Sequence, residues 1–130
     1  MGEARAALSL AADRPIAGVG PGWRSFAWTD ADGSRRVAEY AHNEYLQVLA
    51  ELGVVGLVLL VALLAAVGSI VRHGRRAAPS IEIWAGVAGG LVAVAVHAAS
   101  DFGWHVPAVP LTGALLVGIV MQPRDKENTS

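Results

Sequence analysis

Hydrophobic residues gather in the second half of the chain, in three runs separated by short polar segments. The first run, residues 53–71, has 19 positions without a charged side chain. With a helical rise of about 1.5 Å per residue it reaches about 28 Å, close to the roughly 30 Å of bilayer hydrocarbon. Two further runs, 83–100 and 106–122, contain one ionisable side chain, that of His97. This pattern predicts an all-α membrane protein with three transmembrane helices.

The second and third runs each have a property that bears on membrane insertion. The second is rich in glycine and alanine, which let helices approach closely in lipid. The third is short for a span, and it can cross if Trp104 and Gln122 lie at the interfaces or if the bilayer thins locally.

The first 52 residues are polar by comparison and predict a segment of helix and loop ahead of the spans. Residues 4–12 are strong helix formers, and Pro15 ends this helix. The glycine-rich sequence GVGPGW predicts a tight turn, and TDADGSRR at 29–36 predicts a polar turn.

A second helix is predicted to start at Asn43, a good N-cap, and to run into the first span. Two stripes follow the helical period, one apolar and one polar. The apolar stripe holds Tyr45, Leu46, Leu49 and Leu52, and the polar stripe holds Glu44, Gln47 and Glu51.

The positions of lysine and arginine predict the orientation of the spans, because these residues collect on the cytoplasmic side. Three arginines lie in the linker 72–82, and Arg124 and Lys126 lie in the tail 123–130. The loop 101–105 has no lysine or arginine. We therefore expect the linker and the carboxy-terminal tail in the cytoplasm, and segments 1–52 and 101–105 outside it.

A polar segment such as 1–52 is not easily translocated without a preceding span, and Met1 begins no signal-peptide pattern. We therefore expect that the natural polypeptide starts earlier and that this chain is its carboxy-terminal part.

Composition narrows the class further. Hydrophobic residues make up 54% of the 130 positions and charged residues 16%, which argues against both a water-soluble monomer and a disordered chain. With ten basic and eleven acidic residues, the chain lacks the excess of positive charge that is typical of nucleic-acid-binding proteins. Without cysteine, thiol nucleophiles and cysteine-based zinc sites are excluded.

Three blocks of the sequence, in their order and spacing, resemble a known family. They are DRPIAGVGPGWRSF, AHNEYLQVLAELGVVGLVLL and HAASDFGWHVPAVPLTGALLVG. Together they resemble the carboxy-terminal third of the O-antigen ligase and O-antigen polymerase superfamily, over roughly residues 4–122. The resemblance implies a multi-pass protein of the bacterial inner membrane. It also implies transfer of glycan from an undecaprenyl-pyrophosphate carrier, on the periplasmic face. Earlier spans and the rest of the large periplasmic loop of this family are missing from the chain.

His42 is the candidate catalytic residue. The resemblance implies that a histidine at this position helps an acceptor hydroxyl attack the anomeric carbon while pyrophosphate leaves. An imidazole is suited to this task, because its ordinary pKa near 6.5 lets it accept a proton at neutral pH. The alternative from the residues alone is an interfacial histidine that caps or hydrogen-bonds the start of the helix.

Four further residues are candidates for substrate binding, each with a structural alternative. Arg14 and Arg24 carry guanidinium groups that match phosphate oxygens in pairs, but both could be solvated loop residues. Asn43 could equally be an N-cap, and Tyr45 an interfacial aromatic.

His97, Asp101 and His105 are spaced four apart, so a continuous helix would align them as metal ligands. Gly103 and Pro107 favour a helix break instead, and the resemblance implies transfer without a metal or another cofactor. Asp101 is then a partner for an arginine of a neighbouring helix, or a helix cap.

The resemblance thus implies the end of a metal-independent, inverting glycosyltransferase whose partners are the lipid bilayer, a lipid-linked glycan and an acceptor. The acceptor, whether a growing glycan, lipid A core or a protein, stays open. The alternative is a small non-catalytic membrane protein that packs within a larger complex.

Overall fold

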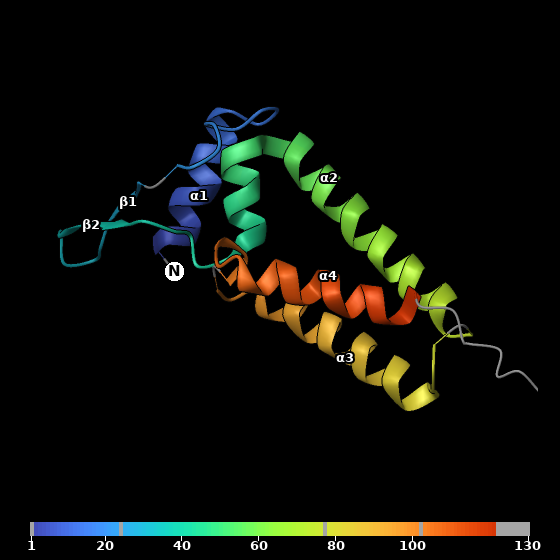
Figure 1. The fold of residues 1–130 in the computed structure, drawn as a ribbon. Coiled ribbons are helices and arrows are strands. Elements are labelled where there is room, and N and C mark those ends of the chain that lie inside the picture. The colour runs from blue at the N-terminus through green and yellow to red at the C-terminus, as the bar shows by residue number, and fades with distance from the viewer. Residues whose placement is uncertain (1, 24, 77, 102, 122–130) are drawn as a thin grey trace, which may run out of the picture.

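The computed structural model describes residues 2–23, 25–76, 78–101 and 103–121. This part of the chain is mostly helical, with a small two-stranded sheet near its start (Figure 1). The elements are α1 (Gly2–Asp13), β1 (Phe26–Thr29), β2 (Arg35–Ala38), α2 (Glu44–Gly74), α3 (Ile81–His97), the 3₁₀ turn η1 (Gly103–His105) and α4 (Ala108–Met121).

Helix α1 covers the predicted stretch 4–12 and packs through its alanines. Its small side chains let the backbone approach the first turns of α2 and strand β1 closely. The buried residues of this cluster are Ala6, Ala7, Phe26, Ala41 and Ala50. Phe26, with no exposed surface, is the large side chain around which the alanines gather.

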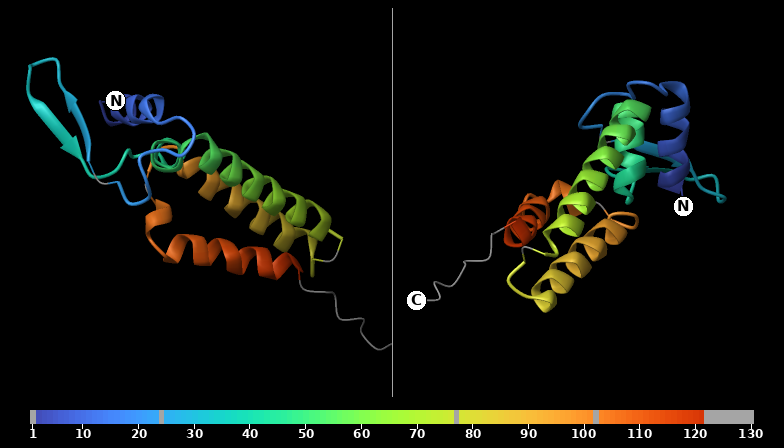
Figure 2. Two further views of the ribbon diagram at one scale, coloured as in Figure 1. Left: turned by 90° about the horizontal axis from the view of Figure 1, so that it is seen from above. Right: turned by 90° about the vertical axis from the view of Figure 1, so that its right-hand side faces the viewer.

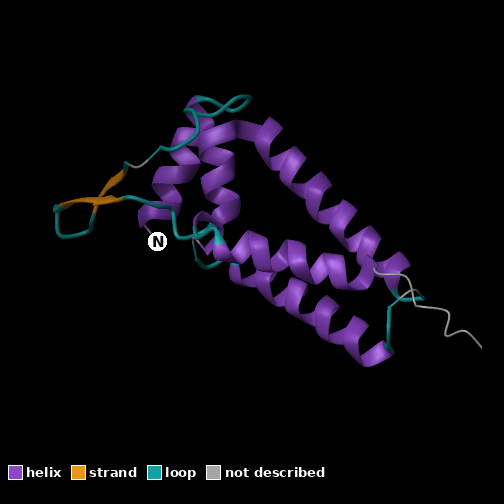
Figure 3. Cartoon of the chain, viewed as in Figure 1, coloured by secondary structure: helices purple, strands orange, loops and turns teal. Residues whose placement is uncertain are grey.

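A β-hairpin encloses the predicted polar turn and corrects the expectation of an all-α segment. Its strands pair antiparallel from Phe26 opposite Ala38 to Thr29 opposite Arg35, and Figure 3 shows them projecting away from the helices. Gly33, at φ +81°, supplies the left-handed residue that the turn needs. Strands of four residues carry too little alternation of polar and apolar positions to stand out in the sequence.

The hairpin turn should respond to acid through Asp32. The hydroxyl and the amide of Ser34 donate to Oδ1 of Asp32 at 2.6 and 2.9 Å, and these bonds lower the pKa of this carboxyl below its ordinary value. Because the pKa of Asp32 is lowered, the ionised carboxylate stabilises the turn fully above about pH 4. This stabilisation is lost as the pH falls through the lowered pKa. The Ser34 amide resonance should therefore move on acidification with a midpoint below the ordinary aspartate range. In Asp32→Asn this movement should disappear, and a midpoint at the ordinary value in the unaltered chain would contradict the contact.

Helix α2 begins as predicted, with Asn43 as its N-cap: Oδ1 of Asn43 accepts from the amide of Leu46 at 3.0 Å. The helix bends sharply at Gly53, whose φ of +66° lies in the left-handed region (Figure 1). It therefore has a polar half before this glycine and an apolar half after it.

The backbone groups that the bend frees are bonded by the loop 15–20. In a continuous helix the amides of Val54 and Val55 would donate to the carbonyls of Ala50 and Glu51. Here these amides donate to the carbonyls of residues 15 and 16, at 2.8 and 3.4 Å. The two helix carbonyls accept instead from the amides of residues 19 and 20, both at 2.9 Å. The loop that leads into the turn predicted from GVGPGW thus supplies the hydrogen bonds that the bend at Gly53 requires.

The apolar half of α2 forms a three-helix layer with α3 and α4. Figure 2 shows the axes of the three helices roughly aligned, with α3 running opposite to the other two and α4 on the side away from α1. They meet around Val71, Val87 and Val120, and Nε1 of Trp84 donates to the carbonyl of Val71 at 2.7 Å. The expected spans 83–100 and 106–122 correspond to α3 and α4 with shifted ends, because Ser80 caps α3 and its last turn closes at His97.

Among the described residues, α2 alone is both long and apolar enough to cross a membrane, and α3 and α4 are shorter apolar helices. The apolar half of α2 is mostly exposed within the chain: Val58 and Leu59 keep 60% and 65% of their surface. A contiguous exposed apolar face of this size is unusual for a soluble monomer and marks an interaction surface.

Candidate functional site

The candidate site lies where the chain enters α2. His42 is exposed and stands two positions before the first helical residue. Nδ2 of the N-cap Asn43 donates to the carbonyl of Ala99 at 2.7 Å, and the amide of Glu44 donates to the carbonyl of Ala98 at 2.9 Å. The helix start is therefore fixed to the end of α3, and His42 is held at a rigid corner.

The backbone of His42 is unusual. Its φ of +49° makes it the one non-glycine residue of the described ranges in the left-handed region. Such a conformation is costly for an L-residue and is found preferentially where surrounding structure enforces it, often at functional sites. The pKa of Glu3, in the first turn of α1, is lowered, chiefly by a hydrogen bond from its own backbone amide.

The polar stripe of α2 faces inward, although it could have been expected to face solvent. Glu44, Gln47 and Glu51 keep only 2%, 3% and 9% of their surface exposed, whereas Leu52 of the apolar stripe keeps 40%. The polar stripe packs on loops that offer backbone donors and acceptors, and the apolar stripe is in part left outside.

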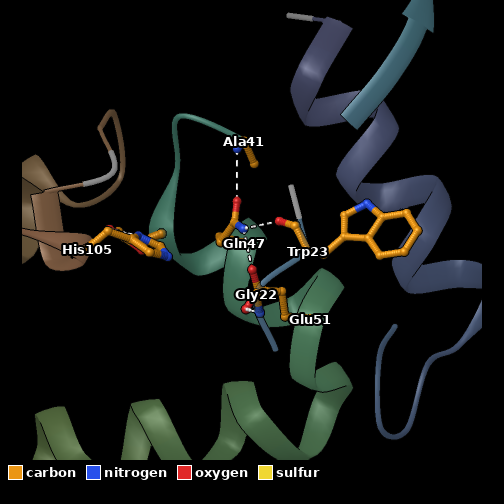
Figure 4. A network of polar contacts seen from close by, with 7 residues as sticks. Gly22, Trp23, Ala41, Gln47, Glu51 and His105 are labelled. Carbon is orange, nitrogen blue, oxygen red and sulfur yellow. Dashed lines mark hydrogen bonds and ion pairs between the residues drawn. The ribbon is translucent and has the colours of Figure 1, made fainter. Parts of the chain in front are cut away.

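Gln47 connects three segments around the helix start (Figure 4). Its Oε1 accepts from the amide of Ala41 at 2.9 Å, and its Nε2 donates to the carbonyl of Trp23 at 3.3 Å. The same Nε2 donates to Oε1 of Glu51 at 2.5 Å, and Oε2 of Glu51 accepts from the amide of Gly22 at 3.1 Å. The network fixes the residues beside His42 and the glycine turn relative to one helix.

His105 belongs to this site, which sequence reasoning missed. Its Nδ1 lies 3.1 Å from Oε1 of the buried Glu44, and its ring lies 4.9 Å from that of Tyr40, centroid to centroid. The spacing of His105 from Asp101 drew attention to a helix face, but η1 turns His105 toward α2 instead. The helix break predicted from Gly103 and Pro107 is confirmed.

The other predicted residues are spread around this corner. Oη of Tyr45 donates to the carbonyl of Ala95 at 2.6 Å, which ties α2 to α3. Asp101 pairs with His97 at 3.3 Å, so its observed partner is a histidine of its own segment. Arg14 is exposed just after α1, and Arg24 lies outside the described residues. Within those residues, no three His, Asp or Glu side chains converge as metal ligands would.

An apolar cavity of about 470 Å³ lies between the apolar half of α2 and the pair α3–α4. Leu63 and Leu64 line it from α2, Leu91 from α3, and Gly113 and Ala114 from α4. The cavity is part of the layer that exposes apolar side chains, and the polar corner with His42 lies at the end of that layer where α3 joins α4.

Fold and site together define a helical protein with a long apolar helix of the dimensions of a membrane span. This helix follows directly on the polar first half of α2, at whose start His42 lies. Residues 3–61 match the model of the O-antigen ligase family. The matched residues include His42, the polar first half of α2 and the bend at Gly53. The block from His97 onward lies outside the match, and its resemblance stays a prediction. No curated protein and no solved structure matches the chain.

Proposed function

We propose that the chain is the carboxy-terminal part of an O-antigen ligase or polymerase type enzyme. In this proposal it transfers glycan from an undecaprenyl-pyrophosphate carrier to an acceptor hydroxyl on the periplasmic face of the inner membrane. The observation that carries the proposal is the family match over residues 3–61, which contains His42 at the exposed entrance to α2.

The chemistry proposed for this site is direct displacement. The acceptor oxygen forms a bond to the anomeric carbon, the bond from that carbon to the pyrophosphate oxygen breaks, and its electron pair leaves with the pyrophosphate. Attack from the opposite face inverts the anomeric centre. His42 assists by engaging the acceptor hydroxyl, which is a poor nucleophile while it keeps its proton.

The substrate-binding residues predicted from the sequence remain part of the proposal, but their roles differ. Guanidinium groups of Arg14 and Arg24 suit the leaving pyrophosphate, since they remain charged and pair with two oxygens at once. Asn43 and Tyr45 already hold backbone groups of α2 and α3, so their contribution is to keep the corner in place.

Three membrane spans are part of the proposal. The apolar half of α2, from Val54 to Gly74, reaches about 31 Å, α3 about 25 Å and α4 about 21 Å. Lipid would cover the exposed valines and leucines of this layer, and local thinning of the bilayer would accommodate the short third helix. The cavity between the helices suits an apolar chain such as that of a polyprenyl carrier.

Cysteine labelling tests the orientation, and the chain is suited to it because it has no native cysteine. Ala31→Cys lies in the exposed hairpin turn, and Arg76→Cys lies in the exposed basic linker. A membrane-impermeant maleimide should label the first variant in intact spheroplasts, and the second only after permeabilisation. The reverse labelling pattern would place His42 in the cytoplasm and would rule out the proposed reaction on the periplasmic face.

The second candidate is a non-catalytic subunit that packs within a larger membrane complex, which the exposed apolar faces of the three helices favour. Replacement of His42 by alanine separates the two candidates when surface glycan is resolved by gel electrophoresis. The enzyme loses transfer, whereas a packing subunit retains it.

A further inference from the structure

A second imidazole, that of His105, stands at the same corner as His42 and is oriented by a buried carboxylate. Its Nδ1 lies 3.1 Å from Oε1 of Glu44, whose side chain keeps 3% of its surface, while the side chain of His105 keeps 36%. One edge of the ring is therefore fixed inside the protein, and another part of it stays accessible.

The partner of Nδ1 defines what the other nitrogen can do. An ionised carboxylate only accepts hydrogen bonds, so Nδ1 of His105 carries the hydrogen in this pair. In the neutral ring Nε2 then holds a lone pair and can accept a proton. The tilted ring of Tyr40, at 51°, packs against the imidazole and restricts its rotation.

The local chain geometry brings this ring to the residues on either side of His42. Tyr40 and Glu44 each lie two positions from His42, on opposite sides of it in the sequence, and both contact His105. The connection from α3 to α4 is anchored here as well, since Ala98 and Ala99 accept bonds from Glu44 and Asn43. Figure 4 shows His105 beside the first turn of α2, on the side opposite Trp23.

We propose that His105 is a second catalytic residue of this site, which receives the proton of the acceptor hydroxyl on Nε2, and that Glu44 is its positioning residue. The inference rests on the proposed function. The O–H bond of the acceptor breaks as its oxygen bonds to the anomeric carbon, the proton moves to Nε2, and the electron pair of the broken sugar–phosphate bond leaves with the pyrophosphate. The Glu44 carboxylate stabilises the imidazolium that forms, and His42 orients the same hydroxyl.

Three variants test the pair in membrane vesicles from cells whose glycan transfer depends on this protein. His105→Gln removes the proton acceptor, and kcat should fall about 100-fold while KM changes less than about threefold. Glu44→Gln keeps an acceptor oxygen for Nδ1 but loses the charge, and kcat should fall at least about 10-fold. His97→Gln is the matched control: this histidine is also paired with a carboxylate, but it is 66% exposed and outside the site, so kcat should stay within about twofold.

A purely structural pair predicts a different result. His105→Gln at the normal membrane level with an unchanged kcat would overturn the proposal, as would a loss confined to KM. If His105→Gln fails to accumulate, Glu44→Gln decides, because it preserves shape and the hydrogen bond. An unchanged kcat in that variant overturns the proposal too. Added imidazole should restore part of the activity of His105→Ala vesicles.

The same assay separates this inference from the proposed function. Loss of transfer in His42→Ala together with normal transfer in His105→Gln rejects the second imidazole alone. Normal transfer in both variants rejects the enzyme assignment as well.

Discussion

His42→Ala should lower glycan transfer at least about 100-fold without changing the amount of protein in the membrane. An imidazole that orients the attacking hydroxyl is worth about 100-fold or more, because a misplacement of about 1 Å in a reacting group can cost that much. The side chain is exposed and outside both apolar clusters, so its removal leaves the packing intact. Gel electrophoresis of the surface glycan, normalised to the protein level by immunoblot, measures the effect.

The backbone of His42 calls for a second substitution beside alanine. At φ +49° a residue with a Cβ carries a conformational cost of about 1–2 kcal/mol, which the native histidine already bears, and asparagine tolerates this region better than alanine does. His42→Asn should therefore match the stability of the parent and still lose transfer. His73→Asn, at the far end of α2, should retain it. Parental transfer by His42→Asn would remove the catalytic role.

Gly53→Val should destabilise the protein by about 3 kcal/mol or more. A side chain at φ +66° is strained, and its Cβ would lie 2.3 Å from the carbonyl oxygen of Ile16. Relief of that clash requires the loop 15–20 to move, which breaks the hydrogen bonds that it shares with both halves of α2. Thermal unfolding of the detergent-solubilised chain, followed by tryptophan fluorescence, should show the loss.

Gly68→Ala is the matched control for this experiment. Gly68 lies in the apolar half of the same helix, and a Cβ there meets nothing within 4 Å. Alanine favours the helix over glycine by about 1 kcal/mol, so this variant should be as stable as the parent or slightly more so. Equal stability of Gly53→Val and Gly68→Ala would mean that the bend is not fixed by its contacts.

Local signals in the sequence predicted the helices well. Asn43 has the side chain of an N-cap and is followed by a long apolar pattern, and both features act within one helix. Gly103 and Pro107 likewise break a helix through their own backbone preferences. The motif around His42 was recognisable for the same reason, because its residues are contiguous.

Features that depend on distant partners were not predictable from the pattern. Gly53 is an ordinary residue of an apolar helix until the loop 15–20 supplies bonds for a bend. Glu44 and Gln47 belong to a stripe that alone would face solvent, and they are buried because loops far along the chain offer polar partners. His105 lies 61 residues from Glu44, and a lone histidine before a proline carries no local sign of that pairing. A histidine near a span end, opposite a glutamate in the first turn of another helix, is the weak signal that could have suggested it.

The angle between the two halves of α2 is independent of the medium around it. The donors and acceptors released at Gly53 are satisfied by the protein's own residues 15–20, so neither water nor lipid headgroups are needed to complete them. We therefore expect the bend at Gly53 to be the same in a bilayer and in a detergent micelle. The polypeptide itself sets the direction of the His42 imidazole relative to the apolar half of α2. We expect this direction to be kept in any detergent or lipid that solubilises the protein.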